Sequence, residues 1–277
     1  MKLFNKIELF SELTFFCNWK CSYCCQNVDH NDTNLISAKT YKLLLYKFLS
    51  EVKKENIPNI EITLMGGELS TNKEFLKHFE ITFELLHKFN INADSILIVF
   101  STNFSGNFDF FNELMDINNN YPTINFCMNI SIHEEYYQQE EKILKFIEKV
   151  NKIKNMIIDI QFLESKNPKF INCFNLFKKH FDKLNKKINI ISTPLIQKGL
   201  AKENNCGIDI SKKINSRLCD VLTYSIMNNK IIDRCKNKEY NFGNFKIDKT
   251  LYKCDKICPC SYMPDEFNQL PIISDKE

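Results

Sequence analysis

Cys17-Asn18-Trp19-Lys20-Cys21-Ser22-Tyr23-Cys24 is the stretch around which the rest of this chain is interpreted. Its thiols are separated by three residues and then by two, and it follows a strand-like apolar run, Ile7–Phe16. A short loop with this spacing can direct three sulfurs to one metal centre while leaving a fourth position without a local ligand. Thiolates are soft donors that suit iron–sulfur clusters or zinc. The stretch therefore predicts a metal centre held by Cys17, Cys21 and Cys24.

The composition is ordinary for a soluble globular protein, with 44% hydrophobic and 26% charged residues among 277. A net charge of +3 gives no argument for binding nucleic acid or an anionic membrane. No apolar run reaches the roughly 20 residues that span a bilayer, and the charged N-terminal segment is a strand rather than a signal peptide. Twelve cysteines without an export signal favour a reducing cytoplasm and metal binding over disulfides.

Apolar runs bounded by turn residues alternate with segments of helical period, which is typical of βα units around a parallel sheet. The expected strands are Ile7–Phe16, Ile60–Met65, Ser95–Ser101, Ile124–Ile132, Met156–Phe162 and Ile188–Ser192. The expected helices are Ala38–Lys54, with Ser37 as its N-cap, Lys73–Phe89, Phe108–Met115, Glu134–Lys152 and Lys169–Leu184. This pattern matches a partial (βα)6 TIM-like barrel rather than the closed eight-fold form.

Polar residues gather where these strands end, which is where ligands bind in such folds. Gly66-Gly67-Glu68 follows the second strand and uses two of the six glycines. Glycine lets a ligand approach the backbone closely, and the carboxylate suits a cationic amine; a simple glycine turn is the alternative. Asn103, Ser131 and Gln161 mark the ends of the next three strands.

The CxxxCxxC loop after the first strand, together with Gly66-Gly67-Glu68 after the second, resembles the radical SAM superfamily. The resemblance implies a [4Fe-4S] cluster on the three cysteines, an open iron chelated by S-adenosylmethionine (SAM), and reductive cleavage of SAM to a 5′-deoxyadenosyl radical. Zinc held by the same thiols and a fourth ligand elsewhere is the alternative. Leu69 replaces the usual proline, and no arginine precedes Arg217. The salt bridge that some relatives make to the SAM carboxylate is therefore replaced or absent.

The same resemblance assigns cofactor-binding roles by position. Gly66, Gly67 and Glu68 would hold the methionine amino group, Tyr23 would lie near the adenine, and Ser131 would meet the ribose or carboxylate. A strand-end serine satisfied by backbone is the alternative for Ser131. Asn103 and Gln161 are weaker candidates for contact with cofactor or substrate. His133 and Glu134, just after the fourth strand, could orient a substrate or move a proton; the alternative is that they begin the following helix and face solvent.

The βα alternation stops near Gly199, and cysteines return in the last quarter of the chain. We expect a domain boundary near Ala201, with a barrel core over 1–200 and a cysteine-rich extension over 201–277. One predicted hairpin joins Val221–Met227 to Ile231–Ile232, and a second joins Phe245–Ile247 to Leu251–Tyr252. The cysteines are similar to those of SPASM and twitch extensions, which hold auxiliary [4Fe-4S] clusters. That resemblance implies one auxiliary cluster with ligands from Cys219, Cys235, Cys254, Cys258 and Cys260, the last two being alternatives; structural zinc is the other possibility.

The expected function is a radical SAM enzyme that modifies a peptide or protein side chain. Radical chemistry on a small molecule (a nucleoside, sugar or cofactor precursor) is the alternative, and a zinc-stabilised binding module without catalysis is a third reading. An electron donor such as flavodoxin or ferredoxin is an expected partner. Because the first strand begins within ten residues of the start, a separate leader-peptide-binding protein is expected to present a peptide.

Overall fold

The structure is a computed structural model of the chain. It describes residues 4–22, 24, 35–91, 95–133, 136–137, 139–164, 168–181, 188–194, 217–218, 221–236, 238–248 and 253–254. No helix among these residues combines the length and the apolarity needed to cross a membrane.

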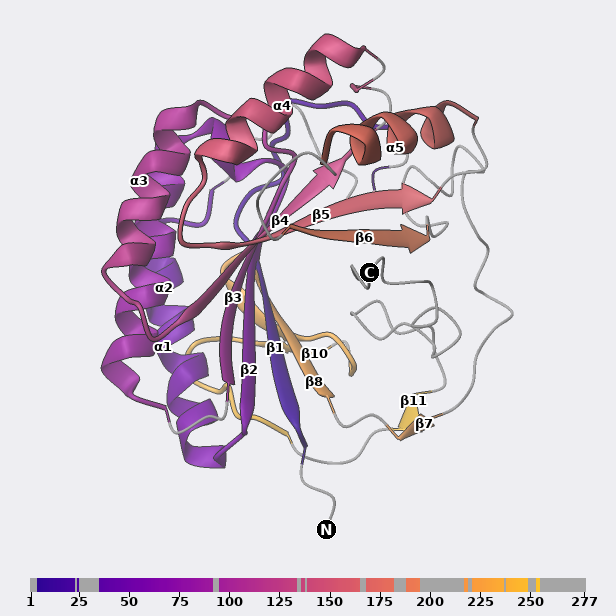
Figure 1. Cartoon of the computed structure of the whole chain (residues 1–277). Coiled ribbons are helices and arrows are strands. Elements are labelled where there is room, and N and C mark those ends of the chain that lie inside the picture. The colour runs from indigo at the N-terminus through magenta and orange to yellow at the C-terminus, as the bar shows by residue number, and fades with distance from the viewer. Residues whose placement is uncertain are drawn as a thin grey trace.

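The core is a parallel sheet whose strands follow one another in chain order, with a helix in each connection. The strands are β1 (Lys6–Glu12), β2 (Asn59–Met65), β3 (Ser95–Thr102), β4 (Asn125–Ile132), β5 (Ile157–Glu164) and β6 (Asn189–Pro194). The helices are α1 (Ala38–Glu55), α2 (Leu76–Phe89), α3 (Phe108–Asn119), α4 (Glu140–Lys152) and α5 (Pro168–Phe181). They lie along the outer face of the curved sheet (Figure 1), which remains open within the described chain. The predicted partial TIM-like architecture is confirmed.

Local signals set the ends of α1 and fix its face. The Ser37 hydroxyl accepts a hydrogen bond from the Thr40 amide, as predicted for an N-cap. Asn56 ends the helix in the left-handed conformation, at φ 50°. Between these ends, apolar residues at helical spacing, including Leu44 and Phe48, are buried against the sheet.

The first predicted C-terminal hairpin is present, and it extends the core sheet. β8 (Val221–Met227) pairs antiparallel with β9 (Lys230–Asp233) and, on its other side, parallel with β1. Asn228 and Asn229 have φ values of 51° and 60°, as a tight hairpin turn requires. The sheet therefore runs β10-β9-β8-β1-β2-β3-β4-β5-β6, with β10 at Lys238–Tyr240.

Several sequence-based boundaries are wrong; α3, for example, continues to Asn119, past the expected end at Met115. The first strand ends at Glu12, short of Phe16, because the chain turns there to contact the end of β2. α4 begins at Glu140 instead of Glu134, since Tyr136 and Tyr137 pack on Trp19 of the cysteine loop. Residues 245–247 lie in no strand, so the second hairpin is wrong in its first arm. Its second arm, 251–252, lies outside the described residues.

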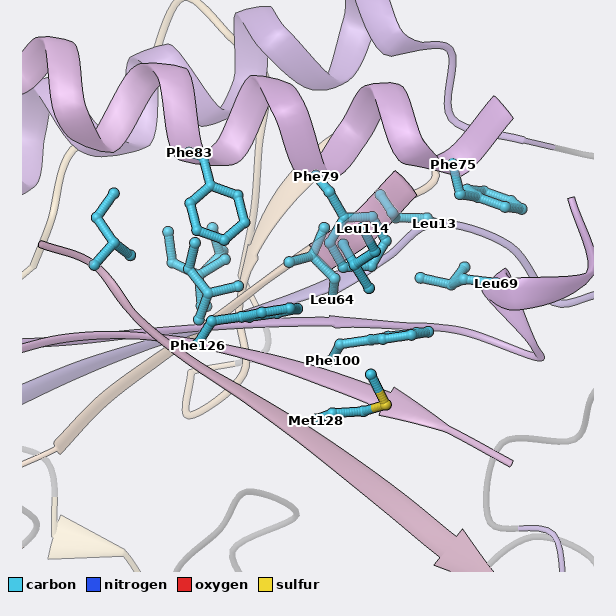
Figure 2. Close-up of a cluster of buried hydrophobic side chains, with 14 of the residues drawn as sticks. Leu13, Leu64, Leu69, Phe75, Phe79, Phe83, Phe100, Leu114, Phe126 and Met128 are labelled. Atoms are coloured by element: carbon cyan, nitrogen blue, oxygen red, sulfur yellow. The ribbon is translucent and has the colours of Figure 1, made fainter. Parts of the chain in front are cut away.

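The hydrophobic core fills the layer between the helices and the sheet. Figure 2 shows Phe79 and Phe83 of α2 above Phe100 of β3 and Phe126 of β4. The ring centroids of Phe79 and Phe100 lie 5.0 Å apart at 79°, an edge-to-face arrangement that aromatic pairs prefer. Residues of alternate position on each strand face this layer, which leaves the remaining side chains for the opposite face.

Candidate functional site

The cysteine loop and the glycine segment meet at the carboxyl ends of β1 and β2. The Gly67 amide donates to the Thr14 carbonyl over 2.9 Å, and the Glu68 amide donates to the Phe16 carbonyl over 2.8 Å. Because β1 and β2 are parallel and adjacent, the segments that follow them leave the same edge of the sheet. The two motifs on which the family resemblance depends are therefore in direct backbone contact.

Both glycines are required by this close packing. A Cβ at Gly67 would lie 1.7 Å from the Phe16 oxygen and 2.8 Å from the Cys17 nitrogen, and one at Gly66 would lie 2.4 Å from the Thr14 oxygen. These neighbours are backbone atoms, which cannot rotate away as a side chain could. The glycine pair thus has a structural role: it places residues 66–68 against the start of the cysteine loop.

Glu68 is buried, with 1% of its surface exposed, and its carboxylate joins the ends of β2 and β3. Oε1 accepts hydrogen bonds from the Ser70 amide, the Ser70 hydroxyl and the Thr102 hydroxyl over 3.0, 2.6 and 2.7 Å, and Oε2 accepts one from the Asn103 amide. Burial raises the pKa of this carboxyl, and the hydrogen bonds oppose the rise. Since Oε1 already accepts three bonds, the remaining acceptor capacity of Glu68 toward an amine lies at Oε2.

Cys17, the first cysteine of the loop, lies near this carboxylate. Cys17 and Cys21 are buried and Cys24 is half-buried, and the Cys24 amide donates to the Cys21 carbonyl over 3.2 Å. Burial raises the pKa of the Cys17 thiol to about 11, with the negative charges of Glu68 and Cys24 adding to the rise. A thiol in this position keeps its proton at neutral pH unless a bound cation compensates the charge.

No three His, Cys, Asp or Glu side chains among the described residues are grouped around a position for one metal ion. A cubane cluster makes a different demand, because each thiolate ligates a separate iron and the sulfurs stand farther apart than ligands of a single ion. Three thiols on one eight-residue loop, two of them buried and Cys17 near a further carboxylate, are a donor set that fits a [4Fe-4S] cluster with one iron open.

Asn103, predicted as a contact residue, lies against the cysteine loop. Its Nδ2 donates to Asn18 Oδ1 over 3.2 Å, and its Oδ1 accepts from the Ser105 amide over 2.9 Å. Asn18 in turn donates to the Ser105 hydroxyl over 2.8 Å. The amide of Asn103 therefore ties the end of β3 to the first residue between Cys17 and Cys21.

Ser131 and Gln161 lie side by side, as paired residues of β4 and β5 on the sheet face away from the helices. This face is polar at several points: the Lys6 ammonium bridges Glu8 and Glu61 over 2.8 and 2.7 Å. Asn129, two residues before Ser131 on the same face, donates to Gln161 Oε1 over 3.3 Å, and its own Oδ1 is buried without a partner in the described chain. Sequence reasoning missed Asn129, although polar residues at alternate positions of a buried strand could have revealed it.

The segment after β4 also contacts the cysteine loop. The Tyr136 ring stacks on Trp19, with centroids 4.0 Å apart and planes at 6°, and His133 meets the same indole edge-on at 5.3 Å. Burial lowers the pKa of His133 to about 4, so its ring is neutral at physiological pH. His133 was singled out by its position, whereas Tyr136 was assigned to a helix and missed.

The predicted auxiliary ligands are only partly described. Cys235 is half-buried in the turn after β9. Cys254 lies in β11 (Lys253–Cys254), where its backbone pairs with Arg217 of β7 (Arg217–Leu218), two positions before Cys219 in the sequence. Tyr23, Cys219, Cys258 and Cys260 lie outside the described residues.

Two further cysteines belong to neither predicted metal centre. Cys127 on β4 and Cys173 on α5 are buried, with 4% and 3% of their surface exposed.

No protein-family model matches the sequence, and no curated protein matches it either. Among solved structures, anSMEcpe with bound AdoMet and the Cp18Cys peptide is similar at 18% identity and a TM-score of 0.49, over 68% of this chain and 51% of that one. anSMEcpe with bound AdoMet alone gives 19% identity and 0.49 over 67% and 52%. Alanine racemase from Clostridium difficile 630 gives 12% identity and 0.31 over 73% and 47%.

The anSMEcpe structures are of a radical SAM enzyme of the SPASM type. This chain spans about half the length of those structures.

Proposed function

We propose that this chain is a radical SAM enzyme. The observation that carries the proposal is the backbone contact between Gly67-Glu68 and the Thr14–Cys17 segment, which brings the two motifs together at one edge of the sheet. A cysteine triplet alone is compatible with zinc. A cysteine triplet packed on a glycine pair and a buried carboxylate, at the carboxyl ends of parallel strands, has the layout expected for a cluster beside an amino-acid cofactor.

In this proposal Cys17, Cys21 and Cys24 hold a [4Fe-4S] cluster, and residues 66–68 bind the methionine amino group of SAM. The bound cluster would supply the electron that cleaves SAM to a 5′-deoxyadenosyl radical. The residues of the chain would bind and orient the cofactor and shield it from water. Glu68 Oε2 and the backbone of the glycine pair offer acceptors to an ammonium group, and Asn103 and Ser131 offer polar contacts at the next strand ends.

The test begins with anaerobic purification, reconstitution with iron and sulfide, and analysis of iron, sulfide and zinc. The wild-type protein should contain iron and sulfide in a cluster with an electron paramagnetic resonance signal after reduction, and should form 5′-deoxyadenosine from SAM. A variant with Cys17→Ala, Cys21→Ala and Cys24→Ala should lose that product. Cys173→Ala, which removes a buried thiol on α5, is the matched control and should keep it. A colourless protein with zinc and no sulfide would instead support the non-catalytic binding module.

The second metal centre is part of the same proposal. Cys219, Cys235 and Cys254, with Cys258 or Cys260, would hold one auxiliary [4Fe-4S] cluster. Cys235→Ala should lower the iron content by about half while leaving the SAM-binding cluster in place, because each cubane contains the same number of irons. Unchanged iron content in Cys235→Ala, with Cys173→Ala as control, would remove Cys235 from the ligand set.

For the substrate, we propose a peptide or protein side chain, presented with help from a separate leader-peptide-binding protein and with electrons from a flavodoxin or ferredoxin. This part rests on analogy with enzymes that carry auxiliary clusters. Substrate-dependent 5′-deoxyadenosine formation separates peptides from nucleosides, sugars and cofactor precursors. A small molecule that stimulates the product while precursor peptides from neighbouring genes do not would contradict the peptide assignment.

A further inference from the structure

The part of the cysteine loop between its first two thiols is held by residues far away in the sequence. Asn18 contacts Asn103 and Ser105 at the end of β3, while Trp19 and Lys20 contact the segment after β4. The backbone bonds from Gly67 and Glu68 secure only the start of the loop, up to Phe16. Within the loop the Trp19 amide donates to Cys17 Sγ over 3.4 Å, and the long-range support of Trp19 and Lys20 comes from beyond β4.

Tyr136 makes two contacts with consecutive loop residues. Its ring stacks on the Trp19 indole at 4.0 Å with the planes nearly parallel, and its hydroxyl oxygen accepts the Lys20 amide hydrogen over 2.8 Å. An offset stack fixes the plane of the indole, and the hydrogen bond fixes the direction of the following peptide group. Together the two contacts define both the side chain and the backbone of the loop at this point.

The neighbouring residues support Tyr136 from the core and from β4. Tyr137 is buried at 7% exposure, and its ring meets Phe146 of α4 and Phe177 of α5 edge-on at 5.4 and 5.3 Å. The same ring lies 6.0 Å from Trp19. His133, at the end of β4, closes another side of the indole at 5.3 Å. Three rings thus contact the partly buried Trp19, and one of them, Tyr137, is itself packed on α4 and α5.

We infer that Tyr136 is a positioning residue that holds the cysteine loop in its cluster-receiving conformation before any metal is bound. We call His133, Tyr136 and Tyr137 the aromatic clasp. The clasp touches residues between Cys17 and Cys21, so it sets the separation and orientation of those two thiols without ligating anything. The role of Tyr136 in cluster insertion rests on the proposed function. Its contacts with Trp19 and Lys20 in the metal-free loop do not depend on that function.

The experiment uses the full chain in its metal-free form, because Trp19 is the one tryptophan and its emission reports on this loop alone. Tyr136→Leu should shift the emission to longer wavelength and raise acrylamide quenching about two-fold, since removing the stacked ring exposes one face of the indole. Tyr46→Leu, at an exposed tyrosine on α1, is the matched control and should change neither quantity. Unchanged emission and quenching in Tyr136→Leu would overturn the clasp.

A conservative variant separates the two contacts. Tyr136→Phe keeps the stack, so the emission of Trp19 should stay as in the wild type. It removes the acceptor for the Lys20 amide, which should exchange its hydrogen with solvent about tenfold faster. Equal exchange in Tyr136→Phe and wild type would contradict the hydrogen-bonded half of the clasp.

Cluster insertion is the second readout. Reconstitution with ferrous iron and sulfide should be slower in Tyr136→Leu than in Tyr46→Leu or wild type, with Tyr136→Phe close to wild type. Equal rates in all four proteins would show that the clasp has no role in receiving the cluster. Absence of iron uptake by the wild type would overturn the proposed function and leave the fluorescence result standing.

Discussion

The Glu68 amide donates a 2.8 Å hydrogen bond to the Phe16 carbonyl, which joins the residue before the first cysteine to the carboxylate that follows the glycine pair. One backbone bond thus connects the two motifs at the point where their strands end. The side chain of Glu68 extends the connection to β3 through Thr102 and Asn103. Glu68 therefore connects the ends of three adjacent strands near the start of the cysteine loop.

The glycine pair gives the first prediction. Gly67→Ala places a Cβ 1.7 Å from the Phe16 oxygen, so the two segments must separate. We expect a loss of about 1–3 kcal/mol in the free energy of unfolding, typical of overpacking, and a fall in iron bound after reconstitution. Gly243→Ala is the control, because its Cβ would meet nothing within 4 Å. Denaturant unfolding and iron analysis check both, and equal behaviour of the two variants would contradict the packing role of Gly67.

Glu68 gives the second prediction. Glu68→Ala leaves the buried donors of Ser70, Thr102 and Asn103 without their acceptor, which should cost about 3 kcal/mol or more of stability. Glu84→Ala, which breaks a surface ion pair with Lys42, should cost less than about 1 kcal/mol. Urea unfolding of both variants measures the difference. A change in Glu68→Ala as small as in Glu84→Ala would show that this carboxylate does not join the strand ends.

His133 predicts a pH dependence of stability. Its pKa is about 4 in the folded protein and near 6.5 when unfolded, so the unfolded chain takes up the proton first as the pH falls. Stability contributed by the neutral ring is present above pH 6.5 and decreases as the pH falls from 6.5 toward 4. The loss amounts to at most about 3 kcal/mol at 1.36 kcal/mol per pH unit.

His133→Asn removes this titration and leaves all others in place. The wild type should therefore lose more stability on acidification than the variant, by up to the amount given above. Urea unfolding at pH values on both sides of the interval measures the difference. If the free energy of unfolding changed with pH in the same way in both proteins, the imidazole would titrate alike in the folded and unfolded states.

The core layer gives the fourth prediction. Phe79 is fully buried, and its ring meets Phe100 and Phe126 edge-on at 5.0 and 6.3 Å (Figure 2). The Phe110 ring meets it edge-on at 6.1 Å. Phe79→Ala should cost about 3–5 kcal/mol, the range for large cavities in a core. Phe242→Ala, at a ring that is 44% exposed, is the control. Thermal or urea unfolding checks the pair, and a small effect at Phe79 would mean that α2 closes the cavity by moving toward the sheet.

The order of strands and helices could be predicted because each carries its own local signal. Buried parallel strands are apolar runs such as Ile96–Phe100, and α1 is marked by Ser37 and by apolar residues at helical spacing. The pairing of β8 with β1 could not be predicted from the sequence, because nothing in the Val221–Met227 run distinguishes a hairpin arm from a strand of the main sheet. That choice is made by tertiary packing, with Tyr224 of β8 meeting Phe48 of α1 at 5.9 Å.

The site was predictable in its parts and not in its connections. The spacing of Cys17, Cys21 and Cys24 and the position of Gly66-Gly67-Glu68 could be read directly. The stacking of Tyr136 on Trp19 depends on the distance between the cysteine loop and the end of β4, which the sequence does not contain. Tyr136 and Tyr137 fit the helical period of the following segment, and the contacts with Trp19 override that preference.

The strand that carries the cysteine loop has neighbours from opposite ends of the chain. Glu12 of β1 and Ser225 of β8 are hydrogen-bonded at a separation of 213 positions. During translation β1 therefore has an open hydrogen-bonding edge until β8 emerges from the ribosome, and unpaired edges invite association with other chains. A nascent chain that stops short of β8 would present its cysteine loop on an incompletely supported strand, so assembly of the proposed cluster would belong after synthesis.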